Sequence, residues 1–200
     1  MEKNILELFL FDNKLKFNEI VKALNQRSNK IAYHLKKLIK KQILIKENET
    51  YSLSKTSEKL IPYLSDKKST LPIILIHLGN EKQCLLYKRK KRPFKDILSL
   101  PGGRLLIKES IQQATKRILK EKHNIKSKLK KVNSVSLEHV KNKNKKVHSF
   151  LLIFVTVTSK DKISLTNIKE NKSKIISSDY KLLKKDLDKE IKIQTLISET

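Results

Sequence analysis

PGGRLLIKESIQQATKRILKEKHNI, residues 101–125, decides the fold of the larger part of this sequence. The stretch opens with Gly102 and Gly103 and runs into residues 110–123, where apolar side chains recur at helical spacing. Glu109, Arg117 and Glu121 place charged groups before and along the same predicted helix. We therefore expect a helix that follows a glycine pair and packs one apolar face on a sheet.

The segments on both sides of this stretch predict the sheet. Upstream, residues 71–78 form a predicted strand, residues 79–82 a hairpin turn and residues 83–90 the partner strand. Downstream, residues 130–139 and 147–158 are predicted strands joined by the basic loop KNKNKK at 141–146, and residues 179–198 form a predicted amphipathic helix. The strand at 147–158 is too apolar to lie on a surface, so we expect it to be buried.

Residues 101–125 resemble a Nudix box, whose pattern is Gly, five residues, Glu, seven residues, then Arg-Glu-apolar-x-Glu-Glu-x-Gly-apolar. The residues that match this pattern are Gly103, Glu109, Arg117, Leu119, Glu121 and Ile125. The pattern's two other metal-binding glutamates and its late glycine are replaced by Ile118, Lys122 and Asn124. With its flanking strands the resemblance covers about 72–197 and implies a Nudix-fold α/β/α mixed-sheet domain at 72–200.

The resemblance implies chemistry that depends on carboxylates. In active Nudix enzymes three box glutamates hold Mg²⁺ or Mn²⁺ against a diphosphate, and here only Glu121 remains, with Glu109 and Arg117 as further vestiges of the box. The interaction energy of two unit charges ~4 Å apart is about 4 kcal/mol at an effective dielectric of about 20. We therefore expect metal affinity to collapse unless another carboxylate such as Glu138 is recruited. No cofactor is expected, and Mg²⁺ or Mn²⁺ would be needed only if some hydrolysis remains.

Loss of the metal does not require loss of a ligand. Lys122 can contact a phosphate directly, Gly102 and Gly103 allow close approach of backbone to ligand, and Arg89 and Arg92 lie in a basic run at 88–92. These five residues are the predicted site for a nucleotide-diphosphate ligand such as ADP-ribose. Two alternatives stay open: the 88–92 run can be a solvated loop, and Glu109, Arg117 and Glu121 can form a structural salt-bridge cluster without a ligand.

The first part of the chain has a different pattern. Residues 4–11, 17–24 and 28–41 are predicted helices, with Ser28 as the N-cap of the third, followed by a hairpin at 43–54 and a helix at 56–64. The string at 31–64 resembles bacterial and archaeal winged-helix regulators, which usually have glycine where Gln42 and Ser57 stand. The resemblance implies a winged helix-turn-helix domain at 1–66, and the polar residues 67–71 before Pro72 are interpreted as a linker.

In such a domain, the exposed face and start of the third helix contact bases and phosphates. The predicted DNA-binding residues, including two in the wing, are Ser28, Asn29, Lys30, Tyr33, Lys36, Lys37, Lys46 and Asn48. Asn29 can bind adenine, whereas Lys30 and Lys37 are expected to contact phosphates. The alternative is a domain that makes only protein contacts.

Composition limits the remaining possibilities. The 200 residues carry a formal net charge of +26, with 33 Lys and Arg against 12 Asp and Glu in residues 67–200. Such a charge attracts polyanions, although a Lys-, Ile- and Asn-rich composition also scatters lysine over solvated surfaces. Cys84 is the only cysteine and is expected to be a buried strand thiol. No apolar run is long enough to span a membrane and no signal peptide is expected, so we predict a cytoplasmic protein.

The sequence thus predicts an α+β protein that acts as a DNA-binding transcriptional regulator, with an impaired Nudix domain that senses a nucleotide diphosphate. Double-stranded DNA and a second copy of the chain, as a homodimer, are the expected partners, and no membrane is. One alternative is a divergent Nudix hydrolase that cleaves nucleoside diphosphate derivatives and has a DNA-binding appendage. A further alternative is a basic, RNA-associated or architectural protein in which the Nudix fold is only a scaffold.

Overall fold

The computed structural model describes residues 1–59 and 69–198, and the chain divides into two compact units, Met1–Lys68 and Ser69–Thr200. The division falls between Lys68 and Ser69, within the predicted linker 67–71. Each unit has its own buried apolar core, so each is described by itself.

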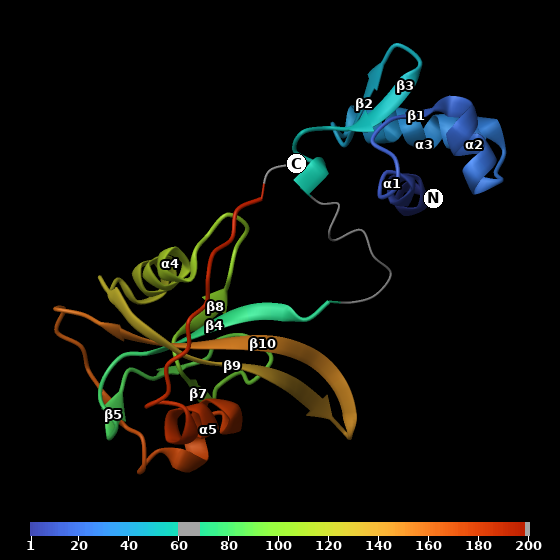
Figure 1. Cartoon of the computed structure of the whole chain (residues 1–200). Coiled ribbons are helices and arrows are strands. Elements are labelled where there is room, and N and C mark those ends of the chain that lie inside the picture. The colour runs from blue at the N-terminus through green and yellow to red at the C-terminus, as the bar shows by residue number, and fades with distance from the viewer. Residues whose placement is uncertain (60–68, 199–200) are drawn as a thin grey trace. The chain divides into compact units, whose positions relative to one another are not determined.

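In its described residues, 1–59, the first unit has three α-helices and a small sheet (Figure 1). In chain order its elements are α1 (Glu2–Leu8), β1 (Leu15–Lys16), α2 (Phe17–Leu24), α3 (Ser28–Lys40), β2 (Leu44–Glu47) and β3 (Thr50–Leu53). The sheet is antiparallel in the order β1-β3-β2. Ile5, Ile20 and Leu35, one from each helix, are almost completely buried in one cluster. The apolar spacing that predicts the helices therefore also builds this core.

The predicted helix at 17–24 is confirmed, and the two others are shifted at their ends. The first helix begins at Glu2 and ends at Leu8, and the third ends at Lys40. Ser28 is not the N-cap of α3: Arg27 occupies that position, since the amides of Lys30 and Ile31 donate to its carbonyl. Of the helix predicted at 56–64, residues 55–57 form a turn and 58–59 are 3₁₀, while 60–64 lie outside the described residues.

The second unit has a four-stranded mixed sheet with a helix on each face (Figure 1). The sheet order is β8-β4-β10-β9, with β4 and β10 parallel and the other pairs antiparallel. Its elements are β4 (Leu71–His77), β5 (Gln83–Cys84), β6 (Tyr87–Lys88), β7 (Leu98–Ser99), β8 (Gly102–Arg104), α4 (Ile111–His123), β9 (Lys128–Asn142), β10 (Lys145–Thr158), β11 (Thr166–Asn167), a 3₁₀ turn at Lys172–Lys174, and α5 (Ser177–Lys185). Separate apolar clusters fill the α4 side and the α5 side of the sheet.

Three predictions for this unit are wrong in part. The loop predicted at 141–146 is only a turn at Lys143 and Asn144, because β9 continues to Asn142 and β10 begins at Lys145. Residues 83–90 do not form a full partner strand for β4, because β8 and β10 occupy both edges of β4; β5 pairs with β11 instead, and β6 with β7. The C-terminal helix ends at Lys185 rather than Ser198. Beyond it, Asn133 donates to the carbonyl of Leu187 at 2.6 Å and the amide of Ile191 donates to Val132 at 2.9 Å, so the chain turns after α5 and forms an isolated antiparallel bridge with β9.

The buried strands hold two predicted features. The strand predicted at 147–158 belongs to β10, whose residues Leu152–Val157 are buried between the two helices. Cys84 is completely buried, and burial raises the pKa of its thiol to about 12, as expected for an inert strand cysteine. Within the described residues, no helix is long and apolar enough to cross a membrane.

The residue that follows the C-terminal cap of α3, Gln42, has a strained backbone conformation. Gln42 has a left-handed φ of 56°, and the amide of the next residue, Ile43, donates to Leu38 in the manner of a helix C-terminal cap that favours glycine. We expect Gln42→Gly to raise the free energy of unfolding by up to about 1 kcal/mol, because it removes the clash of a side chain at positive φ. Urea unfolding of the full chain measures this effect.

Lys40→Gly is the matched control, because Lys40 is exposed and lies in the last turn of α3 with helical geometry. It should lower the free energy of unfolding by about 1 kcal/mol. If Gln42→Gly destabilises the protein as much as this control does, the left-handed turn is not a source of strain.

Candidate functional site

Helix α4 is held at both ends by its own sequence. Ser110 caps the start, accepting from the Gln113 amide at 3.2 Å, while the Gln113 side chain accepts from the Ser110 amide at 2.8 Å. Asn124 ends the helix at φ 55°, the left-handed conformation for which the Nudix pattern has glycine. Asparagine tolerates this conformation better than most residues, so the helix end survives the replacement.

Arg117 ties this helix to the loop before it. Its guanidinium forms two hydrogen bonds to the Glu109 carboxylate and donates to the Arg104 carbonyl at 3.0 Å. The Arg117 hydrogen bond holds the pKa of Glu109 below its usual range. Glu121 is only a distant partner of Arg117, at 3.4 Å. Glu109 and Arg117 therefore form a structural ion pair whose hydrogen-bonding groups are already used.

The two glycines are required by internal packing. A side chain at Gly103 would lie 2.9 Å from Ile118 and 3.3 Å from the ammonium of Lys122. A side chain at Gly102 would lie 2.8 Å from the carbonyl of Ile74. The sequence predicts that these glycines let a ligand approach the backbone closely. In the structure, they allow close packing of β8 on α4 and of β8 on β4.

The positions that carry metal-binding glutamates in the Nudix pattern do not fit a divalent cation here. Ile118 is fully buried in the core on the α4 side of the sheet, and Lys122 places an ammonium next to the Gly102 carbonyl, to which it donates. Glu121 is the one carboxylate left among them. In residues 1–59 and 69–198 no three His, Cys, Asp or Glu side chains are grouped as a metal site requires.

The structure brings the five predicted ligand-binding residues together in one cleft. Arg89, Arg92, Gly102, Gly103 and Lys122 all line it, together with Lys88, Lys90, Lys91, Arg104, Tyr87, His123, Ile73 and Leu75. The cleft has a volume of about 570 Å³. Among the described residues that line it, seven are Lys or Arg and none is Asp or Glu. Of the seven, only Lys88 forms an ion pair within the described residues, with Asp96 at 3.7 Å, so the lining has an excess of positive charge.

Lys122 lies within this concentration of charge. Partial loss of water around its ammonium lowers its pKa, the positive charges of Arg89 and Arg117 lower it further, and the carboxylate of Glu121 opposes them. Within residues 1–59 and 69–198, its ammonium donates one hydrogen bond, to the Gly102 carbonyl. A bound anion would relieve this repulsion, because it supplies the negative charge that the lining lacks.

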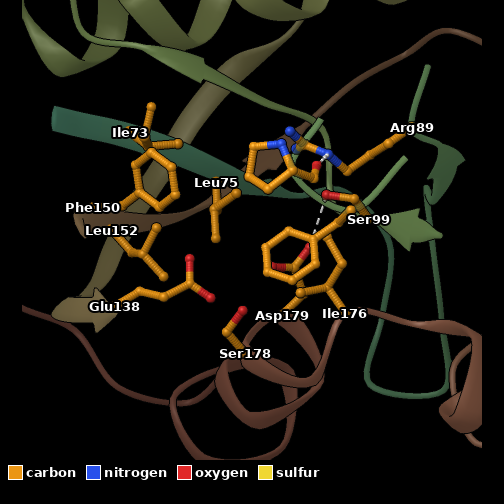
Figure 2. A pocket seen from close by; sticks show the side chains of 12 residues that line it. Ile73, Leu75, Arg89, Ser99, Glu138, Phe150, Leu152, Ile176, Ser178 and Asp179 are labelled. Carbon is orange, nitrogen blue, oxygen red and sulfur yellow. Dashed lines mark hydrogen bonds between the residues drawn. The ribbon is translucent and has the colours of Figure 1, made fainter. Parts of the chain in front are cut away.

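A second hollow adjoins the cleft and shares Ile73, Leu75 and Arg89 with it. Figure 2 shows apolar side chains such as Phe150 and Leu152 on its walls, with the carboxylates of Glu138 and Asp179 among them. Asp179 is buried and accepts from the Ser99 hydroxyl and the Leu100 amide, both at 2.9 Å. Burial raises the pKa of Asp179 to about 6. Sequence reasoning missed this residue, whose only signal is an acid in the first turn of an apolar helix.

In the first unit, the predicted residues of α3 fall into two groups. Asn29, Tyr33 and Lys36 are exposed and, with Lys40, follow the helix at spacings of four, three and four residues, so they form one outward row. Lys37 lies to one side of that row: it pairs with Glu2 of α1 at 3.2 Å, as does Lys41 at 2.7 Å.

The other predicted residues of this unit are exposed. Lys30 donates to Gln26 at 3.3 Å, and Ser28 begins the helix. Asn48 lies in the turn between β2 and β3 at φ 53°, and the ammonium of Lys46 is 5.7 Å from the centre of the Tyr51 ring. The structure therefore presents Lys46 and Asn48 of the β2–β3 hairpin and the outward row of α3 to solvent.

Comparison with known proteins identifies the second unit. The family model described as NUDIX domain matches residues 69–179. The chain belongs to the NUDIX family. A search of curated proteins found no match.

Several solved structures are similar at low sequence identity. A NUDIX hydrolase from Nitrosomonas europaea is 14% identical, with a TM-score of 0.47, over 56% of this chain and 80% of that chain. Shewanella oneidensis NrtR is 16% identical, with a TM-score of 0.44, over 57% of this chain and 60% of that chain. A UDP-X diphosphatase is 13% identical, with a TM-score of 0.46, over 84% of this chain and 94% of that chain. The family assignment rests on the match at 69–179.

The buried carboxyl of Asp179 predicts a pH dependence of stability. Its pKa is about 6 in the folded chain against an ordinary 3.8, so the folded state keeps a proton that the unfolded state loses between these values. The free energy of unfolding should therefore fall as the pH rises from about 4 to 6, on the order of 3 kcal/mol from this group. Asp179→Asn should remove that part of the slope in thermal unfolding.

Asp188→Asn is the control, because Asp188 is exposed. It should leave the pH slope as it is in the unmodified protein. Equal slopes in the unmodified protein and in Asp179→Asn would contradict the raised pKa of Asp179.

Proposed function

We propose that this protein is a DNA-binding transcriptional regulator whose NUDIX domain binds a nucleotide diphosphate without hydrolysing it. The observation that carries the ligand-binding half of this proposal is the cleft, whose described lining has seven cationic side chains and no carboxylate; of the seven, only Lys88 forms an ion pair in the described part of the chain, with Asp96 outside the lining. Lys122 is central to it, because its ammonium lies at a position where the Nudix pattern has a metal-binding glutamate.

The charge of the site favours direct contact with phosphate over metal-assisted hydrolysis. Relative to the Nudix pattern, the positions of Ile118 and Lys122 have lost two carboxylates and gained one ammonium. Each unit charge ~4 Å from a bound cation changes its binding energy by about 4 kcal/mol at an effective dielectric of about 20. The loss of favourable charge is therefore larger than the attraction that Glu121 alone provides. Fixed Lys and Arg side chains then neutralise the diphosphate in place of a cation.

The ligand class follows from the two adjoining hollows. A diphosphate fits the cationic cleft, and the rest of a nucleotide can extend past Arg89 towards the largely apolar second hollow. Tyr87 and His123, in edge-to-face contact at 5.2 Å, add aromatic surface to the cleft wall. A nucleotide diphosphate such as ADP-ribose has both the anionic and the aromatic parts that this arrangement accommodates.

The DNA-binding half of the proposal rests on the first unit. Its three helices followed by the β2–β3 hairpin are the elements of a winged helix-turn-helix, in which α3 is the recognition helix. Asn29 and Tyr33 of the outward row would contact bases, while Lys36 and Lys40 would contact phosphates. Two copies of the chain, as a homodimer, would bind two half-sites, and the ligand would shift the relative placement of their recognition helices.

The cleft predicts anion binding that does not need a metal. Tripolyphosphate in the presence of a chelator should raise the melting temperature of the full chain, because the folded state alone gathers the cations. Lys122→Met should weaken binding at least tenfold, whereas Lys116→Met, an exposed lysine elsewhere on α4, should not. Thermal shift and calorimetric titration measure these effects.

Two outcomes would contradict this prediction. Stabilisation by tripolyphosphate that requires Mg²⁺ would show that a metal site persists. Turnover of ADP-ribose or a nucleoside diphosphate with Mg²⁺ or Mn²⁺, abolished by Glu121→Gln, would instead establish the alternative function, a divergent NUDIX hydrolase with a DNA-binding appendage.

The outward row of α3 predicts sequence-specific DNA binding. Selection of the full chain against a pool of random duplexes should enrich one sequence, and the Asn29→Ala, Tyr33→Ala double variant should lose that enrichment. The Lys37→Ala variant should lose much less affinity for the enriched duplex, because Lys37 is paired with Glu2. A pool that shows no enrichment over the starting duplexes would reject the regulator.

A further inference from the structure

The β9–β10 hairpin continues beyond the rest of the sheet. Phe150 of β10 pairs with Leu71 at the start of β4, so the part of the hairpin before Phe150 has no further neighbouring strand in the described sheet. This part, residues 139–149, is called the arm, and Figure 1 shows the two strands curving away from the sheet there. At ~3.4 Å per residue its two strands extend about 17 Å.

The arm concentrates positive charge. Lys141, Lys143, Lys145 and Lys146 are exposed, and residues 139–160 contain no Asp or Glu. None of the four lysines forms an ion pair with a residue in the described part of the chain. The tip is a two-residue turn at Lys143 and Asn144, both at positive φ, which aligns the strands closely.

The register of the arm works against its own stability. Lys141 pairs directly with Lys146 across the two strands, and like charges in that position repel each other. A two-stranded hairpin without a further neighbouring strand is at best marginally stable in water. The arm therefore has little other stabilisation to offset the repulsion between Lys141 and Lys146. A polyanion that binds both lysines would offset this repulsion, because each lysine is attracted to the anion.

From this geometry we propose that the arm is a second nucleic-acid contact of the protein, which binds the phosphate backbone of duplex DNA without reading its sequence. A two-stranded ribbon fits the major groove, and the exposed lysines reach phosphates on its sides. Asn142, Asn144 and the lysines make the tip polar, so it lacks the apolar anchor that would favour a membrane surface. The inference rests on the DNA partner of the proposed function but uses a different part of the chain.

The test compares two variants of the full chain that each lose four positive charges. In the arm variant, Lys141, Lys143, Lys145 and Lys146 are changed to Gln. In the control variant, the exposed Lys160, Lys162, Lys169 and Lys181 are changed to Gln. Fluorescence anisotropy with a labelled random-sequence duplex, over a series of salt concentrations, gives affinity and the number of phosphate contacts.

The arm variant should bind at least tenfold more weakly, and the slope of log affinity against log salt should fall by about 2 to 4. The control variant should change less than threefold. Unchanged tripolyphosphate binding shows that the arm variant is folded, because the arm does not line the cleft. Equal losses in the two variants would overturn the proposal, since net charge alone would then explain binding.

Two comparisons separate this proposal from its neighbours. If the arm variant binds as the unmodified chain does, while Asn29→Ala, Tyr33→Ala loses enrichment of a selected sequence, the arm is rejected and the proposed regulator is retained. If the arm variant loses binding to phosphatidylserine-containing vesicles but keeps its affinity for duplex DNA, the proposal is overturned in favour of a membrane partner.

Discussion

The contact between Gly103 of β8 and Ile118 of α4 is the constraint on which the NUDIX unit depends. A side chain at Gly103 would meet Ile118 at 2.9 Å, so the helix lies as close to the strand as a glycine allows. Ile118 is fully buried in this contact and belongs to the core that joins α4 to β4 and β10. The position where the Nudix pattern has a metal-binding glutamate is thus used for packing. Four residues later, on the same side of the helix, Lys122 reaches Gly102.

Two kinds of charged group surround that contact, and they have different roles. Arg117 and Glu109 neutralise each other and connect the loop to the helix, so their charges are used within the protein. Lys122 and Arg89 form no ion pair within the described residues, and Lys88, paired with Asp96, is the one cation of the described lining that does. Gly103, Glu109 and Arg117 of the Nudix pattern pack and pair within the protein, while the described lining of the cleft carries an excess of positive charge. Anion binding without a metal is the function that this combination favours.

Several features were predictable because they depend on local sequence. The helix at 17–24 and the helix after Ser110 follow from apolar spacing and capping residues, which act within a few positions of the chain. The C-terminal helix was predicted too long because Leu183, Leu187 and Ile191 have helical spacing. In the structure, the carbonyl of Leu187 and the amide of Ile191 form hydrogen bonds with β9 instead of with a helix. Hydrogen bonds between distant segments won over local periodicity there. The strand at 83–90 failed for a related reason, since both edges of β4 were already paired.

The sequence by itself determined the NUDIX frame, the loss of carboxylates at the positions of Ile118 and Lys122, and the excess of positive charge, because these are properties of residue identity and spacing. Only the tertiary structure decided which charges remain available. It pairs Lys37 with Glu2 and Arg117 with Glu109, gathers Arg89, Arg92 and Lys122 in one cleft, and buries Asp179 beside it. The physical reason is that a charge is neutralised or left free by neighbours in space, and these neighbours come from distant parts of the sequence.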